Sequence, residues 1–180
     1  MSQQVDRYWL SICDAVASNS KCLSRKLGAV ITTADSRFII STGYNGPPSG
    51  CFHCDDPMYR GRIYNMYYGP NNPGEWDRLD DITQCPRKHL GFKSGEGMEY
   101  CQAAHAEVNA INTAARLGHS TENGILYFNW IIPCVECCKS IINAGIKRVI
   151  VKKYQVYDKN GLTGLYLLNT SGVQVKEMEA

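Results

Sequence analysis

Residues 103–153 constrain the fold most, because two segments with helical spacing alternate there with two short apolar segments. The helical segments are residues 103–118 and 133–145, each of which ends at a glycine. The apolar segments, residues 124–130 and 147–153, have the length and the β-branched content of strands. A helix that connects two strands lets them pair in parallel within one sheet. The sequence therefore predicts an α/β fold with parallel strands in its second half.

The flanking segments add elements to both ends of this pattern. Residues 5–17 repeat apolar side chains at helical spacing, and the β-branched residues 28–33 and 37–44 predict a hairpin. Residues 162–172 predict a last, irregular helix, and residues 173–177 predict a final short strand. The order of elements predicts a single domain of 180 residues with a three-layer α-β-α fold around a mixed five-stranded sheet.

The composition is that of an ordinary globular protein, 44% hydrophobic and 20% charged, with a formal net charge of +2. This charge is too balanced to indicate a large surface for a nucleic-acid polymer, although it is compatible with a small anionic ligand. No apolar run reaches the ~18 residues that span a bilayer. The start of the chain, MSQQVDRYWL, lacks the pattern of a secretory signal. We therefore expect a cytoplasmic protein with no membrane partner.

Residues 46–100 differ from the rest of the chain, because they are rich in proline, glycine and tyrosine and show little periodicity. We interpret them as a long insertion that needs an additional element to hold it together. The chain has nine cysteines, an odd number, and nothing in the sequence directs export. Thiols stay reduced in a reducing compartment, so clustered cysteines favour metal binding over disulfides.

The two helical segments of residues 103–153 begin with side chains that bind zinc. His105 is predicted in the first turn of one helix, and Cys134 and Cys137 in the first turn of the other, where their spacing puts both sulfurs on one face. The partial positive charge at a helix N-terminus favours the thiolate that a metal needs. One imidazole and two thiolates leave a fourth position for water, which is typical of a catalytic zinc site. Each residue alone also fits a simpler interpretation, a core histidine or inert buried thiols, so the combination carries the prediction.

Glu107 lies two residues after His105 and cannot share the histidine's face of a helix. We therefore interpret it as a carboxylate beside the water rather than as a ligand. In that place it can take a proton from the water and hand protons to a substrate. The pattern His105-Ala-Glu107, followed by Pro133-Cys134-Val-Glu-Cys137, is the signature of zinc deaminases.

Three further stretches narrow this class: GAVI…STGYNGPPSG, CPRKHLGFKSGEGMEYCQAAHAEVNAI and AGIKRVIV…YDKNG. With them the chain resembles the deoxycytidylate (dCMP) deaminases of the cytidine deaminase superfamily, from about Lys21 to its C-terminus. The resemblance implies a cytidine-deaminase-like fold and the hydrolysis of dCMP to dUMP and ammonia, which in that family supplies dUMP for dTTP synthesis. It also implies that His105, Cys134 and Cys137 hold the zinc, and that Glu107 moves protons while C4 of cytosine is attacked.

The resemblance extends to residues that bind the nucleotide. Asn45 matches an asparagine near the sugar, and Tyr157 matches a tyrosine near the 5′-phosphate. Arg25 and Lys26, which precede the first strand, are further candidates for the phosphate, and Ala106 is a candidate substrate-binding residue. The alternative for Arg25, Lys26 and Tyr157 is ordinary solvated surface.

A second zinc is also implied, because family members with this long insertion often use it to bind one. The candidate ligands would form a closed four-thiolate site: Cys22, Cys54, Cys85 and Cys101. A metal would stabilise a segment with so little apolar periodicity. His53 and His89 are alternative ligands, since other members use a histidine there. The cysteines left over are Cys13, Cys51 and Cys138, of which Cys138 is predicted to face the core. The alternative is that all these thiols are free.

Assembly and regulation are the last implications of the resemblance. We expect a homohexamer in which residues 43–50, GYNGPPSG, form part of a second nucleotide site, with dCTP and Mg²⁺ as activator and dTTP as inhibitor. The candidate allosteric residues are Tyr44, Asn45, Gly46, Pro47 and Gly50, with Arg116 in a subunit contact. The glycines would let backbone N–H groups approach phosphates. The alternative is a proline-rich turn that only reverses the chain.

Two other classes of function compete with this interpretation. One is a deaminase of the same superfamily that acts on a base within RNA or single-stranded DNA, which would need a basic channel for the backbone. The other is a zinc-stabilised binding module without catalysis. Glu107 discriminates against the second class, because a purely structural site has no use for a carboxylate beside an open position.

Overall fold

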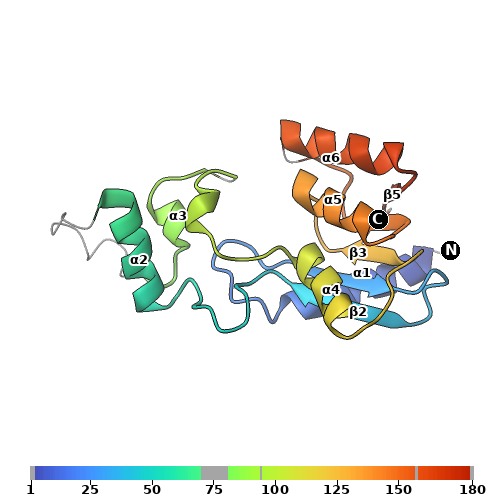
Figure 1. The fold of residues 1–180 in the computed structure, drawn as a ribbon, viewed down its shortest axis with the longest axis horizontal. Coiled ribbons are helices and arrows are strands. Elements are labelled where there is room, and N and C mark those ends of the chain that lie inside the picture. The colour runs from blue at the N-terminus through green and yellow to red at the C-terminus, as the bar shows by residue number, and fades with distance from the viewer. Residues whose placement is uncertain (1–2, 70–80, 94, 157, 179–180) are drawn as a thin grey trace. The chain divides into compact units, whose positions relative to one another are not determined.

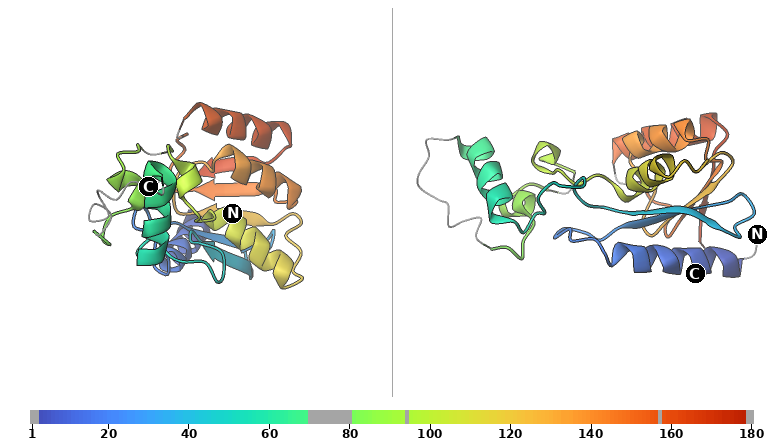
Figure 2. Two further views of the ribbon diagram at one scale, coloured as in Figure 1. Left: turned by 60° about the vertical axis from the view of Figure 1, so that its left-hand side comes forward. Right: turned by 60° about the horizontal axis from the view of Figure 1, so that its bottom comes forward.

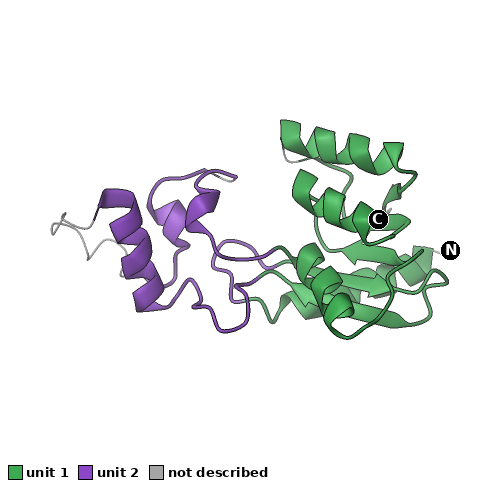
Figure 3. Cartoon of the chain, viewed as in Figure 1, with its two compact units in different colours: residues 1–20, 27–45, 105–180 green, residues 21–26, 46–104 purple. Residues whose placement is uncertain are grey.

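A computed structural model describes residues 3–69, 81–93, 95–156 and 158–178, which form two compact units (Figure 3). Unit 1 comprises residues 1–20, 27–45 and 105–180. Unit 2 comprises residues 21–26 and 46–104, and so includes the predicted insertion, residues 46–100. The single-domain organisation stays a prediction. No helix within the described residues is both long and apolar enough to cross a membrane.

The helices and strands of unit 1 follow one another along the chain in the predicted order, and the strands form one sheet (Figure 1). Its elements are α1 Gln3–Ala17, β1 Gly28–Thr32, β2 Ile39–Tyr44, α4 Ala106–Arg116, β3 Ile125–Phe128, α5 Val135–Asn143, β4 Arg148–Val151, α6 Lys159–Thr170 and β5 Gln174–Glu177. The strand order is β2-β1-β3-β4-β5. Strand β1 is antiparallel to β2 and to β3, whereas β3, β4 and β5 are parallel. The predicted mixed five-stranded sheet is therefore confirmed.

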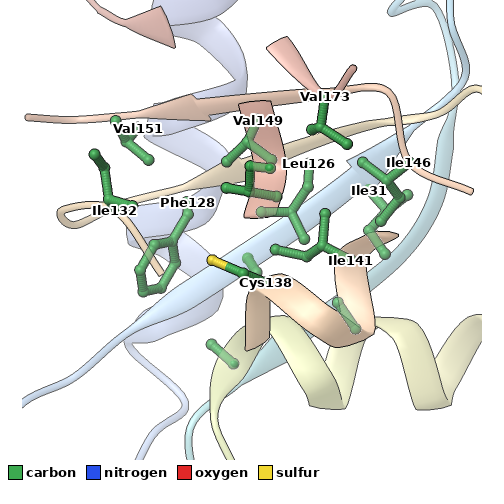
Figure 4. Close-up of a cluster of buried hydrophobic side chains, with 14 residues drawn as sticks. Ile31, Leu126, Phe128, Ile132, Cys138, Ile141, Ile146, Val149, Val151 and Val173 are labelled. Atoms are coloured by element: carbon green, nitrogen blue, oxygen red, sulfur yellow. The ribbon is translucent and has the colours of Figure 1, made fainter. Parts of the chain in front are cut away.

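The strand register sorts the apolar side chains onto two faces of the sheet. It pairs Ile31 with Leu126, and Leu126 with Val149, in one row across the sheet. This row packs against α4, α5 and α6 in a buried cluster that includes Cys138 and Ile141 (Figure 4). Successive residues of a strand point to opposite faces, so each strand supplies a second row as well.

The second row covers the other face of the sheet, against α1. Val30 pairs with Tyr127, and Tyr127 with Ile150, and these residues pack with Trp9 and Leu10. Helix α1 therefore forms one layer, the sheet the second, and α4, α5 and α6 the third (Figure 2). The three-layer α-β-α architecture is confirmed for unit 1.

Helix α6 is more regular than residues 162–172 alone predict. It begins earlier, at Lys159, because the Asp158 carboxylate caps it by accepting a hydrogen bond from the N–H of Gly161, at 2.9 Å. Gly164 lets α6 approach α5 closely, since a Cβ atom at this position would lie 2.9 Å from the sulfur of Cys138. Gly164 is thus a packing position within a regular helix.

Unit 2 contains helix α2 Pro57–Tyr68, the short helix α3 Pro86–His89 and the 3-10 helix η2 Met98–Tyr100. The sequence did not predict α2. Asp56 caps this helix by accepting from the N–H of Met58 at 2.9 Å, and proline occupies its first position. Its buried side chains are Tyr59, Arg60, Ile63 and Tyr64. Three of these four side chains carry polar groups, so the buried face of α2 does not appear as an apolar repeat in the sequence.

Candidate active site

The three predicted zinc ligands lie together in unit 1, at the starts of α4 and α5. His105 is the N-cap residue of α4 and Cys134 is the N-cap residue of α5, whereas Cys137 lies in the first turn of α5. The prediction that His105 and Cys134 belong to the first turn is wrong by one residue each. Both have extended backbone, with φ and ψ of −74° and 152° at His105 and −65° and 163° at Cys134.

The distances between the donor atoms fit a zinc ion. Nδ1 of His105 lies 3.4 Å from Sγ of Cys134 and 3.3 Å from Sγ of Cys137. All three donor atoms lie within 4.8 Å of one another. Tetrahedral bonds of about 2.0 Å to nitrogen and about 2.3 Å to sulfur separate two ligand atoms by roughly 3.5 Å. This histidine and the two cysteines therefore match the donor types and the spacing of a zinc site with three protein ligands and one open coordination position.

The thiol protons are shared unequally in this group. Hydrogen bonding with Cys137 and with His105 lowers the pKa of the Cys134 thiol to about 4, against the opposing effect of burial. The pKa of Cys137 is raised, because its thiol is hydrogen-bonded to Cys134 and is buried. The hydrogen bond with Cys134 also raises the pKa of His105 to about 8. The lowered pKa favours the thiolate at Cys134, whereas the raised pKa values favour the protonated forms of Cys137 and His105, so metal binding would displace a proton from each of these two residues.

Glu107 is buried in the first turn of α4, with only 2% of its surface exposed. Within the described residues, its Oε2 atom has no hydrogen-bond partner. Burial raises the pKa of this carboxyl to about 7, although the charge of His105 opposes the shift. A carboxyl that titrates near neutral pH beside a donor set can both accept and return a proton. A buried oxygen without a hydrogen-bond partner, such as Oε2 of Glu107, is also typical of a site that binds a further ligand.

Strand β2 fixes the position of α4, a feature that the sequence prediction missed. At Gly43 a Cβ atom would lie 2.2 Å from the backbone nitrogen of Ala110 and 2.4 Å from the carbonyl oxygen of Ala106. The hydroxyl of Ser41 donates to the carbonyl of Ala110 at 2.8 Å. Glycine at the end of a β-branched run was the available signal, since it marks a close backbone approach. Ala106, predicted to contact substrate, is fully buried between His105 and Glu107.

Asn45 is held firmly at the end of β2. Its Oδ1 atom accepts a hydrogen bond from the N–H of Leu27 at 2.8 Å, and its carbonyl accepts from the hydroxyl of Ser20 at 2.6 Å. Tyr44, next to it, is exposed, and its carbonyl accepts from Nδ2 of Asn109 in α4 at 2.8 Å. Arg116 is exposed at the end of α4. The roles predicted for Asn45, Tyr44 and Arg116 stay predictions.

The other predicted nucleotide-binding residues lie in unit 2 or outside the described residues, so their roles stay predictions. Arg25 and Lys26 belong to unit 2, as do the predicted allosteric residues Gly46, Pro47 and Gly50. Gly50 adopts a positive φ of 83°, which suits glycine in a tight loop. Tyr157 lies outside the described residues.

All four predicted ligands of the second zinc lie in unit 2. Burial raises the pKa of the Cys54 thiol to about 12, and the neighbouring charges of Cys101, Cys22 and Cys85 raise it further. These three sulfurs are therefore within electrostatic reach of Cys54. Among the described residues, however, only the group around His105 brings three donor atoms within 4.8 Å of one another. The four thiols gather without reaching the spacing of bound ligands.

The leftover cysteines have separate places. The sulfur of Cys13 donates to the carbonyl of Tyr127 at 3.3 Å, between α1 and the sheet. Cys138 is fully buried in the cluster beneath α5, as predicted. Cys51 is exposed in unit 2.

Comparison with known proteins places this fold and donor set in a family of zinc deaminases. Residues 3–153 match the cytidine and deoxycytidylate deaminase zinc-binding region. The chain is 34% identical over 176 residues to the deoxycytidylate deaminase of Enterobacteria phage T2, covering 92% of this chain and 88% of the relative. It is 30% identical over 172 residues to the human deoxycytidylate deaminase, covering 94% and 77%. The chain therefore belongs to the cytidine and deoxycytidylate deaminase family.

A solved structure supports the same fold. The dCMP deaminase of the cyanophage S-TIM5, crystallised with dCMP and dUMP, superposes with a TM-score of 0.64 at 22% identity, and the match covers 98% of each chain. The range that matches the family, residues 3–153, spans His105, Glu107 and both cysteines of the donor set.

Proposed function

We propose that this protein hydrolyses dCMP to dUMP and ammonia. One observation carries the proposal: the buried carboxyl of Glu107 lies beside the His105, Cys134 and Cys137 donor set, in a chain 34% identical to a deoxycytidylate deaminase. A zinc-stabilised binding module would not need a buried carboxyl that titrates near pH 7. A polynucleotide deaminase would need a basic channel, whereas the net charge is +2.

In this proposal the residues of the site divide the chemistry between them. His105, Cys134 and Cys137 would hold the zinc, which when bound supplies a Lewis acid that activates water for attack on C4 of cytosine. Glu107 takes a proton from the attacking water and gives it to ring N3; it then takes the proton of the hydroxyl group now on C4 and gives it to the leaving amine. In the metal-free site, burial raises the pKa of Glu107 to about 7, which favours a carboxyl that can both accept and release a proton. Asn45 would contact the sugar, and Arg25, Lys26 and Tyr157 the 5′-phosphate.

The test is a deamination assay that compares dCMP with CMP, dCTP, cytidine and a cytosine-containing oligonucleotide. We expect turnover of dCMP to exceed that of the others. Equal turnover of cytidine would contradict a role for the phosphate, and activity confined to the oligonucleotide would favour the polynucleotide alternative. Zinc-loaded protein without activity on any substrate would favour the binding module.

A second zinc, bound by Cys22, Cys54, Cys85 and Cys101, is the structural part of the proposal. The gathering of these thiols around Cys54 supports it. Purified protein should then contain two zinc ions per chain, and Cys85→Ser should contain one. The variant should lose stability while the chemistry at Glu107 continues. A metal analysis of one zinc in the unmutated protein would remove this site.

Regulation is the third part. We infer that the protein forms a homohexamer, supplies dUMP for dTTP synthesis, and is activated by dCTP with Mg²⁺ and inhibited by dTTP through residues 43–50. The hydrogen bond from Asn109 to the Tyr44 carbonyl supports a coupling between this loop and α4, which ends at Arg116. Sigmoidal dCMP kinetics should become hyperbolic with dCTP. If neither triphosphate changes the rate at low dCMP, the loop has no regulatory role.

A further inference from the structure

Two adjacent residues at the start of α2, Tyr59 and Arg60, are buried, with 6% and 3% of their surfaces exposed. Both side chains end in polar groups, and each polar group contacts main-chain atoms of a cysteine or of a residue next to one. A buried guanidinium or phenol is costly unless hydrogen bonds satisfy it. The hydrogen-bond partners of Tyr59 and Arg60 therefore indicate which segments of unit 2 these two side chains hold in place.

The guanidinium of Arg60 joins the segments that carry two of the four cysteines. Its Nη1 atom donates to the carbonyl of Cys54 at 2.9 Å and to the carbonyl of Gln84, the residue before Cys85, at 3.0 Å. Its Nη2 atom donates to the carbonyl of Asp81 at 2.7 Å. One planar cation thus holds two cysteine-bearing segments at fixed places. Hydrogen bonds to a charged donor are stronger than those between neutral groups.

The hydroxyl of Tyr59 holds a third segment. It donates to the carbonyl of Tyr100 at 2.6 Å and accepts from the N–H of Gln102 at 3.3 Å, so it contacts the main chain on both sides of Cys101. The side chain of Gln102 in turn donates to the carbonyl of Phe52 at 2.6 Å, in the segment that precedes α2. These contacts make no use of a sulfur atom and so can form before any metal binds.

These contacts address the main difficulty of a four-thiolate site in such a segment. Three of its ligands come from positions 54, 85 and 101, and a metal that also had to order those segments would bind weakly, because ordering costs free energy. Partners that orient ligands from outside the coordination shell typically change metal affinity by ~10–100-fold.

We propose that Tyr59 and Arg60 are positioning residues that hold the main-chain segments of Cys54, Cys85 and Cys101 in place for a thiolate-binding divalent ion, which would then draw the sulfur atoms to the spacing of ligands. This inference rests on the second zinc of the proposed function, and adds the device that assembles it. Cys22, from residues 21–26 of the same unit, would supply the fourth thiolate.

The test is chelator competition on the zinc-loaded protein, with release of each zinc followed by a chromogenic chelator. Arg60→Met removes the cation and keeps much of its volume, and Tyr59→Phe removes only the hydroxyl. The matched controls are Arg62→Met and Tyr67→Phe, at exposed positions of the same helix. We expect each clamp variant to release one zinc at ~10–100-fold lower chelator concentration, while the controls match the unmutated protein.

The zinc at His105 serves as an internal reference, and Cys85→Ser identifies which ion is released. If Tyr59 and Arg60 had a merely structural role, their variants would weaken the binding of both zinc ions or of neither. A positioning role weakens the binding of one zinc ion only. Cobalt substitution adds a spectroscopic signature, because the thiolate-to-cobalt absorption of the second site should need more cobalt to saturate in Tyr59→Phe. Arg60→Lys should restore part of the affinity that Arg60→Met loses. If Arg60→Met does not fold, Tyr59→Phe decides alone.

The outcomes separate the two levels of the argument. If the unmutated protein holds one zinc and Cys85→Ser holds one as well, the second site is absent and the positioning role falls with it. If the unmutated protein holds two and both clamp variants release them as the controls do, the site stands and the positioning role is overturned. Equal weakening of both zinc ions also overturns it.

Discussion

Replacing Glu107 by glutamine tests whether the active site keeps an ionisable carboxyl at a cost to stability. Glutamine has nearly the same shape but never ionises. Glu107 is buried and its Oε2 atom has no hydrogen-bond partner within the described residues, so its charged form is poorly solvated. In metal-free protein the charged carboxylate should therefore destabilise the fold, and the variant should be the more stable protein at high pH.

The size and sign of the effect follow from the pKa. Burial raises the pKa of Glu107 from 4.5 to about 7, and at about 1.4 kcal/mol per pKa unit this shift corresponds to about 3 kcal/mol. Because the folded pKa is raised, the contribution of Glu107 to stability is fully present below pH 4.5 and is lost as the pH rises through about 7. Relative to the unmutated protein, Glu107→Gln should gain little near pH 4.5 and up to about 3 kcal/mol above pH 7.

The assay is denaturant unfolding of both metal-free proteins from pH 5 to pH 8. Glu136→Gln is the matched control, because Glu136 is an exposed carboxylate in the first turn of α5. Its loss should change the free energy of unfolding by no more than about 0.5 kcal/mol at either pH. In zinc-loaded protein, Glu107→Gln should keep its zinc and lower kcat by about 10²–10⁴-fold, the usual contribution of a general acid–base group.

Two results would refute this reasoning. A stability difference that is the same at pH 5 and pH 8 would show that burial of the carboxylate does not dominate the site. Loss of zinc in Glu107→Gln, or a near-normal kcat, would show that Glu107 is a ligand or a bystander rather than the proton carrier.

Three further predictions test how the fold supports the site. Gly43→Ala should lower the free energy of unfolding by about 1–3 kcal/mol and reduce kcat, because the Cβ atom of the new alanine would lie 2.2 Å from the backbone of α4. A normal kcat would contradict the role of this contact. Lys176→Met should destabilise the protein by about 1–3 kcal/mol in thermal or denaturant unfolding, since it leaves the fully buried Asp6 without its 3.1 Å ion pair, whereas no change would mean that other groups satisfy Asp6. Gly164→Ala should destabilise through the contact with the sulfur of Cys138, and Cys138→Ala should relieve part of that loss in a double-mutant cycle; additive effects would exclude the contact.

The elements of unit 1 could be predicted because their signals are local. Strands β1 and β3 are short, mostly apolar runs that are buried along their length, and α4 and α5 bury residues at helical spacing. The zinc ligands could be predicted for the same reason, because they lie at the starts of two helices and each start has a short motif, His105-Ala-Glu107 or Cys134-Val-Glu-Cys137. Only the places of His105 and Cys134 differed, by one residue each, since an N-cap and a first turn cannot be told apart from sequence.

The features that the sequence did not predict depend on contacts between distant segments. Gly43 matters because β2 lies against α4, which no local pattern records. Helix α2 was missed because Tyr59 and Arg60 are buried for their hydrogen bonds rather than for their hydrophobicity. The Asp56-Pro57 pair was the local signal of its start.

The two candidate metal sites are positioned by different forces, and this difference predicts the order in which they fail. Behind His105 and Cys137, the helices α4 and α5 pack on a cluster of fully buried apolar side chains that includes Ala110 and Ile141. Both clusters of buried hydrophobic side chains found among the described residues come from unit 1. In unit 2 the cysteine segments are tied by hydrogen bonds from Tyr59 and Arg60, together with ring contacts of Tyr67 with Phe92 and Tyr100.

Regions with few buried apolar contacts open at lower free energy than the core does. Moderate denaturant should therefore release one zinc from unit 2 before the sheet of unit 1 unfolds. The measurement is chelator-detected zinc release beside far-ultraviolet circular dichroism across a urea series. Cys85→Ser is the control, since it should lack the early phase and keep the late one. Release of both zinc ions in a single step that coincides with the loss of secondary structure would contradict separate stabilities for the two sites.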